Sequence, residues 1–335
     1  QELNQRHGGE RFFLFHRERK WSESEQKYIG WERKRGKLEE LNGLIDGTRP
    51  DAADQLVHVG DPDQLAYVRF VITLDSDTQL PHDTARRMIE TLAHPLNRAH
   101  FDGAGQVQSG YTIIQPRVNP SLPSANGSPF SRLFSDPIGI DPYSSAVSDV
   151  YQDLAGEGSY HGKGIYDVRT FSRVLSRRFP EAMLLSHDLI EGAHVRVGLA
   201  SDIELFDEFP QDYLSYIKRH HRWTRGDWQI ADWIMPRVPK PGGGRIPNPL
   251  SLFDRWKIFD NLRRSLLPAT TLALLITSWL IAPRIGLITS IVVAVQLLFH
   301  SLLQPFTWVT KRHGLRGFSL KKVSHDLLRV VVEAS

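Results

Sequence analysis

The chain has 335 residues, enough for one large domain or two modest ones with a real core. Its 41 Lys and Arg against 38 Asp and Glu give a net charge of +3, which does not argue for nucleic acid as a partner. It has no cysteine, which excludes disulfides and thiolate metal sites and suits a reducing compartment. The chain begins at Gln1 without a signal-peptide pattern and ends within an apolar run, so we expect a piece of a longer protein.

The amino-terminal region combines a short predicted strand, Phe12–Phe15, with a charged segment, Trp21–Asn42. The basic side chains grouped in that segment are Arg33, Lys34, Arg35 and Lys37. They form either a solvated face or a basic loop that leads a helix toward an anionic group, and the residues leave both interpretations open. The polar stretch Asp46–Asp63 is predicted to be a connector.

The segment Tyr67–Leu80 (YVRFVITLDSDTQL) carries the most informative motif. Its apolar, β-branched first half predicts a strand buried on both faces of an α/β sheet. The strand runs into Asp75 and Asp77, which are separated by one small residue. A helix is then predicted from Pro81 to about Leu92, because apolar residues recur at helical spacing.

A strand, an acidic tip and a helix in this order place both carboxylates at the carboxyl end of a parallel strand, where open α/β sheets bind ligands. Hard divalent cations take oxygen ligands, and Mg²⁺ commonly bridges carboxylates and substrate phosphates. The pattern therefore favours a metal–diphosphate site at Asp75 and Asp77. The alternative is that the two carboxylates only cap the following turn and helix, since the motif is short.

Three further segments are predicted before the next acidic motif. Gly110–Val118 reads as a second apolar strand, and Asn119–Asp141, rich in Pro, Ser and Gly, reads as a long binding or gating loop. Gly156–Phe171 has four glycines, which allow backbone to approach a ligand closely. It lacks the spacing of a P-loop.

A helix is predicted to begin at Ser186, which can cap it, and to stop at Gly198. Asp188 then lies in the first turn, where the helix dipole favours its ionised form. A core face is predicted for Leu189, Ala193 and Val197.

Another helix is predicted from Pro210 to about Ile234. The residues on one of its faces, at three- and four-residue spacing, are Arg219, Arg222, Trp223 and Gly226. They form either a binding face or a pair of solvated arginines beside a core tryptophan.

The last third of the chain has a membrane-like pattern. After a Gly/Pro linker, the amphipathic segment Leu252–Arg264 is typical of an interfacial helix. Leu266–Ala282 and Ile285–Val309 are each near the roughly 20 apolar residues needed to cross a bilayer. Basic residues cluster at both open ends of this hairpin, which predicts that both ends face the cytoplasm. The alternative is a pair of buried core helices in a soluble protein.

The strings TLDSDTQLP, GKGIYDVRTF, LLSHDLIEG, RHHRWTRGDWQ and RWKIFDNLRRSLLP together resemble the glycosyltransferase region of cyclic β-1,2-glucan synthases. These enzymes are among the processive, membrane-embedded family 2-type glycosyltransferases. The resemblance covers nearly all of the chain from about residue 10 onward. It implies an α/β fold of the Rossmann-like GT-A type that uses UDP-glucose with Mg²⁺ or Mn²⁺ and extends a growing glucan.

The resemblance also implies roles for the motif residues. Asp75 and Asp77 would bind the metal and the donor diphosphate, and Asp188 would be the general base. Arg219 and Arg222 would hold the diphosphate, although Arg219 stands where cellulose synthases have Gln. The remaining implied residues are Lys37 and Asn42 near the nucleotide, and Trp223, His187, Gly162 and Gly164 on the acceptor side.

The expected organisation has four parts: a GT-A domain at 1–240 that lacks its amino-terminal part, a linker and interfacial helix at 241–264, two transmembrane helices at 265–310, and a cytoplasmic amphipathic segment at 311–335. The expected location is a bacterial inner membrane, with a multi-pass chain, a cytoplasmic catalytic domain, and contacts to lipid and to the rest of the parent polypeptide. Because only 74 residues precede Asp75, we expect this piece to lack part of the donor site and to be inactive alone.

These residue types suit the chemistry without reference to the family. Displacement of UDP from an α-linked donor by a sugar hydroxyl needs one base and positive charge where the leaving group becomes anionic. Two other hypotheses stay open. One is another processive β-glucan synthase, of the osmoregulated periplasmic or cellulose-like kind, and the other is a membrane-anchored, non-catalytic binding module.

Overall fold

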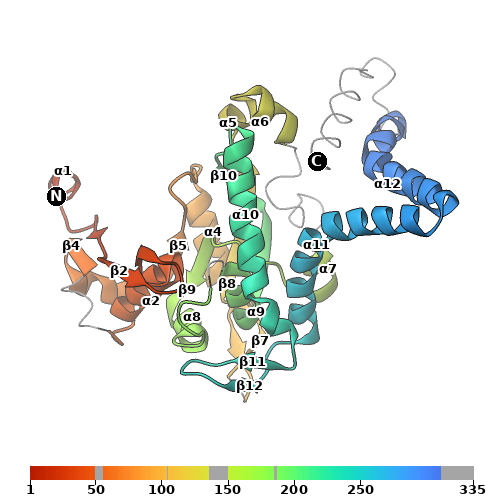
Figure 1. Ribbon diagram of the computed structural model, residues 1–335. Coiled ribbons are helices and arrows are strands. Elements are labelled where there is room, and N and C mark those ends of the chain that lie inside the picture. Colours follow the sequence, from red (N-terminus) through yellow and green to blue (C-terminus); the bar gives the residue numbers. More distant parts are fainter. Residues whose placement is uncertain (50–55, 104, 136–149, 185–186, 311–335) are drawn as a thin grey trace. The chain divides into compact units, whose positions relative to one another are not determined.

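The computed structural model describes residues 1–49, 56–103, 105–135, 150–184 and 187–310, with the side chains of the last helix described to Gln296 (Figure 1). The predicted cytoplasmic segment 311–335 and Ser186 lie outside the described residues. The chain divides into two compact units. One comprises Gln1–Ser121, Pro137–Glu208 and Ile217–Phe259, and the other comprises Leu122–Asp136, Phe209–Tyr216 and Asp260–Ser335.

The first half of the chain contains these elements: α1 (Glu2–His7), β1 (Leu14–Phe15), β2 (Arg19–Ser22), β3 (Lys27–Gly30), α2 (Arg33–Ile45), β4 (Val57–Val59), η2 (Pro62–Tyr67), β5 (Phe70–Thr73), α4 (Thr84–Ala93), η3 (Pro95–Asn97), β6 (His100–Phe101), β7 (Val107–Ser109), β8 (Ile113–Pro120), α5 (Leu122–Asn126) and α6 (Pro129–Phe134).

The second half contains α7 (Val150–Ala155), β9 (Gly164–Asp167), α8 (Val168–Leu175), α9 (Asp188–Val195), β10 (Val197–Asp207), α10 (Tyr213–Gln229), η4 (Ala231–Ile234), β11 (Arg237–Pro239), β12 (Arg245–Pro247), α11 (Leu252–Ile281) and α12 (Pro283–Thr310).

A mixed four-stranded sheet with the order β10-β8-β9-β5 organises the first unit. β8 and β10 are parallel, whereas β9 is antiparallel to both β8 and β5. The prediction that the strand before Asp75 pairs with parallel neighbours is therefore wrong, because β5 is an edge strand that pairs only with the reversed β9 among its sheet partners. Since β9 is reversed, β5, β8 and β10 still run in one direction, and their carboxyl ends share one edge of the sheet.

Alternation along the strands divides the core into two layers, one on each face of the sheet. Ile113 and Tyr166 belong to the layer that also contains residues of α8 and α9. Their neighbours Ile114 and Ile165 belong to the other layer, with Met88 and Leu92 of α4. This arrangement explains the helical spacing of apolar residues in α4, whose buried positions face the sheet. β5 itself is only half-buried, so the predicted burial on both faces is overstated.

Several predicted boundaries move in the structure. The basic cluster lies in the first turns of α2 rather than in a loop. The predicted loop Asn119–Asp141 contains α5 and α6, and Ser128 forms a capping box with Ser131 at the start of α6. Residues 136–141 of that segment lie outside the described residues. Helix α9 ends at Val195, and the residues expected to finish it begin β10 instead.

α5, α6 and the first turn of α10 pack together in the second unit (Figure 1). The Phe130 and Phe134 rings lie 5.6 and 5.8 Å from the Tyr216 ring, and Gln211 donates a hydrogen bond to the Ser124 carbonyl over 2.8 Å. These aromatic contacts explain why a segment rich in Pro, Ser and Gly forms helices here.

The predicted linker and interfacial helix also differ from expectation. β11 and β12 form a hairpin inside the linker, and α11 joins the predicted interfacial segment and the first apolar segment in one helix. The predicted boundary at 264/265 falls within α11. Within the segment predicted to be amphipathic, Lys257 is buried and forms an ion pair with Asp254 over 2.8 Å, while Trp256 is half exposed.

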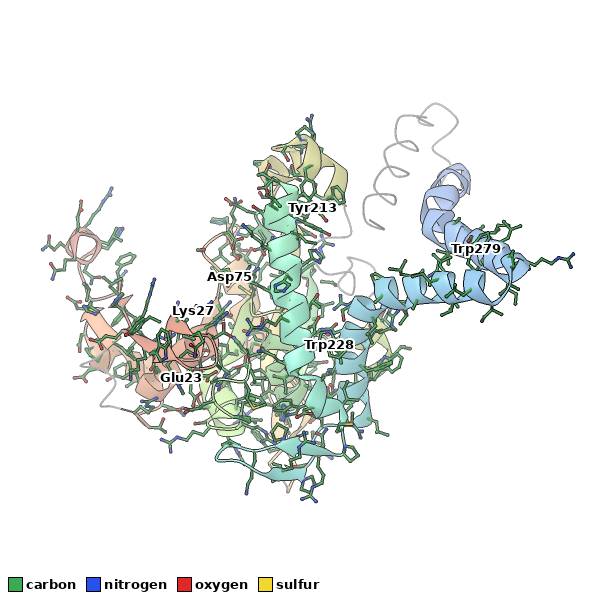
Figure 2. All side chains as sticks on the ribbon, viewed as in Figure 1. Glu23, Lys27, Asp75, Tyr213, Trp228 and Trp279 are labelled. Atoms are coloured by element: carbon green, nitrogen blue, oxygen red, sulfur yellow. The ribbon has the colours of Figure 1, made fainter. Side chains whose placement is uncertain are left out.

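α12 follows α11 almost directly, as the predicted hairpin requires. Trp279, labelled in Figure 2, donates a hydrogen bond to Ser290 over 3.0 Å, and its ring lies so close to Gly286 that a side chain there would collide with it. In the described part of the chain, α11 is long and apolar enough to cross a membrane by length and composition. The part of α12 whose side chains are described, Pro283–Gln296, is apolar but shorter than a span, so a second span stays a prediction.

Met88 provides a test of the α4 layer because its side chain is fully buried, whereas that of its neighbour Ile89 is 41% exposed. We expect Met88→Ala to lower the free energy of unfolding by about 2–5 kcal/mol, through lost burial and the cavity left behind. The matched change Ile89→Ala should alter it by less than about 1 kcal/mol. Chemical denaturation of the two variants measures the difference, and equal values would contradict this packing.

Candidate active site

Charged side chains from separate elements converge at the edge where β5 and β10 end and β9 begins. Asp75, labelled in Figure 2, follows β5, and Asp207 is the last residue of β10. Lys163 directly precedes β9, Lys34 lies in the first turn of α2, and Asp188 is the first residue of α9. The sheet topology explains this convergence, because a reversed β9 begins where its neighbours end.

Two lysines hold the carboxylate of Asp75. Lys34 Nζ lies 2.6 Å from Asp75 Oδ1, and Lys163 Nζ lies 3.1 Å from Asp75 Oδ2. Burial alone would raise the pKa of Asp75, but hydrogen bonds and charge from the two lysines outweigh it and lower the pKa below its usual value. Asp75 is therefore ionised at neutral pH and paired on both of its oxygens.

Lys163 connects Asp75 to Asp207, whose side chain is fully buried. Burial disfavours the charged form of Lys163, but Asp207 and then Asp75 outweigh it and raise the pKa of the ammonium group. Thr78 donates a hydrogen bond to Asp207 Oδ1 over 2.7 Å and accepts one from the Asp75 amide over 3.2 Å. The turn that carries Asp75 is thus fixed to the end of β10.

Gly162 lies between Asp75 and Asp188. Its carbonyl accepts a hydrogen bond from Lys34 over 2.7 Å, and Lys34 in turn contacts Asp75. Gly162 has φ +78°, and a Cβ at this position would lie 2.7 Å from Asp188 Oδ1. A residue with a side chain would be strained at this φ and would collide with the Asp188 carboxylate, so glycine is required here. Its absence of a side chain lets that carboxylate lie against the backbone of the segment that carries Lys163. A Cβ on Gly164 would instead meet the Ile114 carbonyl, so Gly164 serves the sheet here.

His187 and Glu191 lie beside Asp188 in the interior. His187 is the N-cap of α9, and its Nδ1 lies 2.8 Å from Glu191 Oε2 and 3.5 Å from Asp188 Oδ1. Burial would lower the pKa of His187, but Glu191 and then Asp188 raise it. His187, which the resemblance places on the acceptor side, is thus buried, with its Nδ1 next to the Glu191 carboxylate.

α10 brings an arginine to the second carboxylate of the acidic tip. Arg219 Nη2 lies 3.6 Å from Asp77 Oδ2, and Nη1 donates a hydrogen bond to the Glu208 carbonyl over 3.2 Å. The guanidinium also lies over the Trp223 ring, 5.4 Å from its centroid. Arg222, one turn farther, is exposed.

Sequence reasoning missed several residues of this site. Lys34, rather than the exposed Lys37, contacts Asp75. Asn42 is buried and accepts a hydrogen bond from the Tyr166 hydroxyl over 2.9 Å. Glu191 could have been found from its i,i+4 spacing to His187, which places both on one helix face. Pairing of Lys163 with a residue at the end of a distant strand had no local signal.

A metal ion could be held at two places by donor type. Asp75 and Asp77 offer carboxylate oxygens, which suit Mg²⁺ or Mn²⁺, and Asp77 is the one without a lysine partner in the described contacts. The ligand atoms of His187, Asp188 and Glu191 also lie within 4.8 Å of one another. Because His187 already lies at hydrogen-bonding distance from Glu191, we interpret that second group as a protein-internal pair.

The fold and the site together define an α/β protein with a cluster of charged side chains at one edge of a mixed sheet, where β5 and β10 end. Over 277 residues the chain is 47% identical to the cyclic β-(1,2)-glucan synthase NdvB of Rhizobium meliloti (strain 1021). No protein-family model matches it. The resemblance inferred from the motifs is confirmed, since the chain is similar to a region of a cyclic glucan synthase. The alignment takes in 81% of this chain and 9% of that relative's length.

The buried pair of Lys163 and Asp207 should support the stability of this edge. Lys163→Met leaves the fully buried Asp207 without its cation, so we expect a loss of about 3–5 kcal/mol in the free energy of unfolding. Adding Asp207→Asn removes the lone charge and should restore part of the loss. Thermal or chemical denaturation of the single and double variants forms the test, and additive losses would contradict the pairing.

Proposed function

We propose that the chain is the catalytic part of a membrane-bound inverting glucosyltransferase of the GT-A type. It transfers glucose from UDP-glucose to a growing β-1,2-glucan. The observation that carries this proposal is the convergence at Gly162: the carboxylate of Asp188 lies against this residue, and Lys34 links its carbonyl to the carboxylate of Asp75. The similarity to a cyclic β-(1,2)-glucan synthase supports the choice of product.

Asp188 is the proposed general base. An acceptor hydroxyl attacks the anomeric carbon of the donor from the side opposite UDP, gives up its proton to the Asp188 carboxylate, and leaves a β-linkage. The Asp188 side chain is 28% exposed, so its carboxylate can reach a bound hydroxyl. General-base catalysis of this kind contributes roughly 10²–10⁴-fold.

Positive charge for the departing diphosphate comes from lysines and an arginine at the same edge. Lys34, Lys163 and Arg219 each lie against a carboxylate of the acidic tip, which fixes them before the donor arrives. Preorganised charge of this kind usually stabilises a developing anion more than proton transfer to a base does. Mg²⁺ or Mn²⁺, held by Asp77 with Asp75, would supply further charge at the diphosphate.

The exposed face of α10 supports an acceptor path. The Trp223 side chain is 38% exposed, and the Arg219 guanidinium lies over its ring. An exposed aromatic ring held in this way is suited to stack on a sugar. We place the growing glucan at Trp223 and leave Arg222, which is also exposed, for the diphosphate.

α11 supports a membrane location for the site. Only 6% of its most apolar stretch is buried, which differs from the mostly buried core helix of a soluble protein. We propose that α11 and α12 anchor the chain in a bacterial inner membrane, with the charged site on the cytoplasmic side where the nucleotide sugar is available.

Asp188 provides the direct test of the mechanism. In the full-length protein we expect Asp188→Asn to lower incorporation of radiolabelled glucose from UDP-glucose by roughly 10²–10⁴-fold. The fold and UDP binding should be preserved, since the amide is nearly isosteric. Asp202→Asn, which removes an exposed carboxylate paired with Arg87, is the matched control. Retained turnover in Asp188→Asn would favour a binding module, and linkage analysis of the product separates this synthase from other processive β-glucan synthases.

Asp77 tests the proposed metal site by a measurement independent of turnover. Electron paramagnetic resonance of Mn²⁺ in the presence of UDP should show that Asp77→Asn weakens binding of the ion about tenfold or more, because it removes the carboxylate that has no lysine partner. Asp202→Asn should bind Mn²⁺ as the unmodified protein does. Unchanged Mn²⁺ affinity in Asp77→Asn would exclude this site.

A further inference from the structure

Glu191 is a buried carboxylate for which the proposed reaction has no use. Its residue is only 3% exposed, and it lies one turn after His187 on α9, which is itself 5% exposed. An ionised carboxylate is rarely placed in a protein interior without a cation or hydrogen-bond donors. Its described partner is His187, whose ring nitrogen is 2.8 Å away.

His187 links this buried carboxylate to the proposed base. Its Nδ1 lies 3.5 Å from Asp188 Oδ1, an oxygen that is buried and has no hydrogen-bond partner. The same ring nitrogen therefore faces two carboxylates: that of Glu191 at hydrogen-bonding distance, and that of Asp188, the proposed base, slightly farther away. The backbone at Gly162 also lies close to the Asp188 carboxylate, since a Cβ on Gly162 would touch it, and this leaves the carboxylate little room to rotate.

We propose that Glu191 and His187 are positioning residues for Asp188: Glu191 holds the His187 ring in its charged form, and that positive charge orients the Asp188 carboxylate for proton transfer. This proposal rests on the proposed function and refines it. It moves His187 from the acceptor side, where the resemblance placed it, to a supporting place behind the base. An ion pair between Glu191 and His187 carries no net charge, which makes its burial tolerable.

The charged groups around the ring determine the sign of the effect. Glu191 and Asp188, both on α9, favour the imidazolium form, and Arg35 of α2 opposes it. Arg35 is itself paired with Glu32 over 2.7 Å, which weakens its influence. The nearby Tyr160 is buried, and burial and the charge of Asp188 raise its pKa, so it stays neutral. The net result agrees with the geometry, since the pKa of His187 is raised despite its burial.

The test measures the pH dependence of glucose transfer by the full-length protein in membranes. His187→Gln removes the positive charge next to Asp188 and leaves the negative charge of Glu191 unbalanced. With a net negative charge left beside the proposed base, the acidic limb of the kcat profile should move to higher pH by about one unit. Adding Glu191→Gln removes the unbalanced negative charge and should move the limb back toward that of the unmodified protein.

The controls separate positioning from a general structural effect. Glu90→Gln, on the exposed face of α4 where Glu90 pairs with Arg86, should not reverse the shift when combined with His187→Gln. The KM for UDP-glucose and the affinity for UDP should stay within about twofold in all variants, because the groups that face the diphosphate are unchanged. A His187→Gln profile that superimposes on that of the unmodified protein, or a shift that Glu191→Gln fails to reverse, would overturn the proposal.

Two further outcomes are informative. If His187→Gln alone does not accumulate in a folded form, the double variant, which buries no lone charge, is compared directly with the unmodified protein. Because both charges are gone, its acidic limb should lie close to that of the unmodified protein, but its plateau kcat should fall about tenfold while UDP affinity is kept, since the ring no longer orients Asp188. An unchanged plateau kcat would overturn the proposal. Full activity of Asp188→Asn would instead reject the proposed function, so the two failures are distinguishable.

Discussion

The ion pairs of Lys163 are the interaction on which the candidate site depends. One ammonium group contacts Asp207 at the end of β10 and Asp75 after β5. Those two strands are the outer strands of the sheet, so a single side chain next to β9 links both sides of the ligand edge. Burial makes each charge costly unless it is paired, and this cost fixes the geometry, because neither Asp207 nor Lys163 can move without leaving an uncompensated charge in the interior.

The site is therefore organised around carboxylates that already have cationic partners. Asp75 contacts two lysines, Asp77 is near Arg219, and Asp188 lies beside His187. Charge held in this way needs little rearrangement when an anionic ligand arrives, which is the property expected of a site that stabilises a departing diphosphate. A purely structural acidic tip would not need three basic groups from different elements directed at it.

Two glycines at this edge of the sheet allow close approaches that a side chain would block. Gly162 allows the Asp188 carboxylate to lie against the backbone, and its carbonyl receives Lys34. Gly164, two residues later, allows β9 to approach the Ile114 carbonyl of β8. The first glycine therefore allows Asp188 to lie near Lys34 and Lys163, while the second brings the strands together. Both lie in the glycine-rich segment that the sequence marks for close approach, but only one of the approaches is to the site.

The sequence by itself determined the local features: the strand that leads to Asp75 and Asp77, the helix after it, the helical turn that carries Asp188, and the shared face of Arg219 and Trp223. These follow from periodicity and capping, which act over a few residues. The tertiary structure alone decided the reversal of β9 and the choice of Lys34 and Lys163 as partners of Asp75. It also decided the burial of His187 against Glu191. Strand order and buried ion pairs join residues far apart in the chain, and no local pattern records which charges folding brings together.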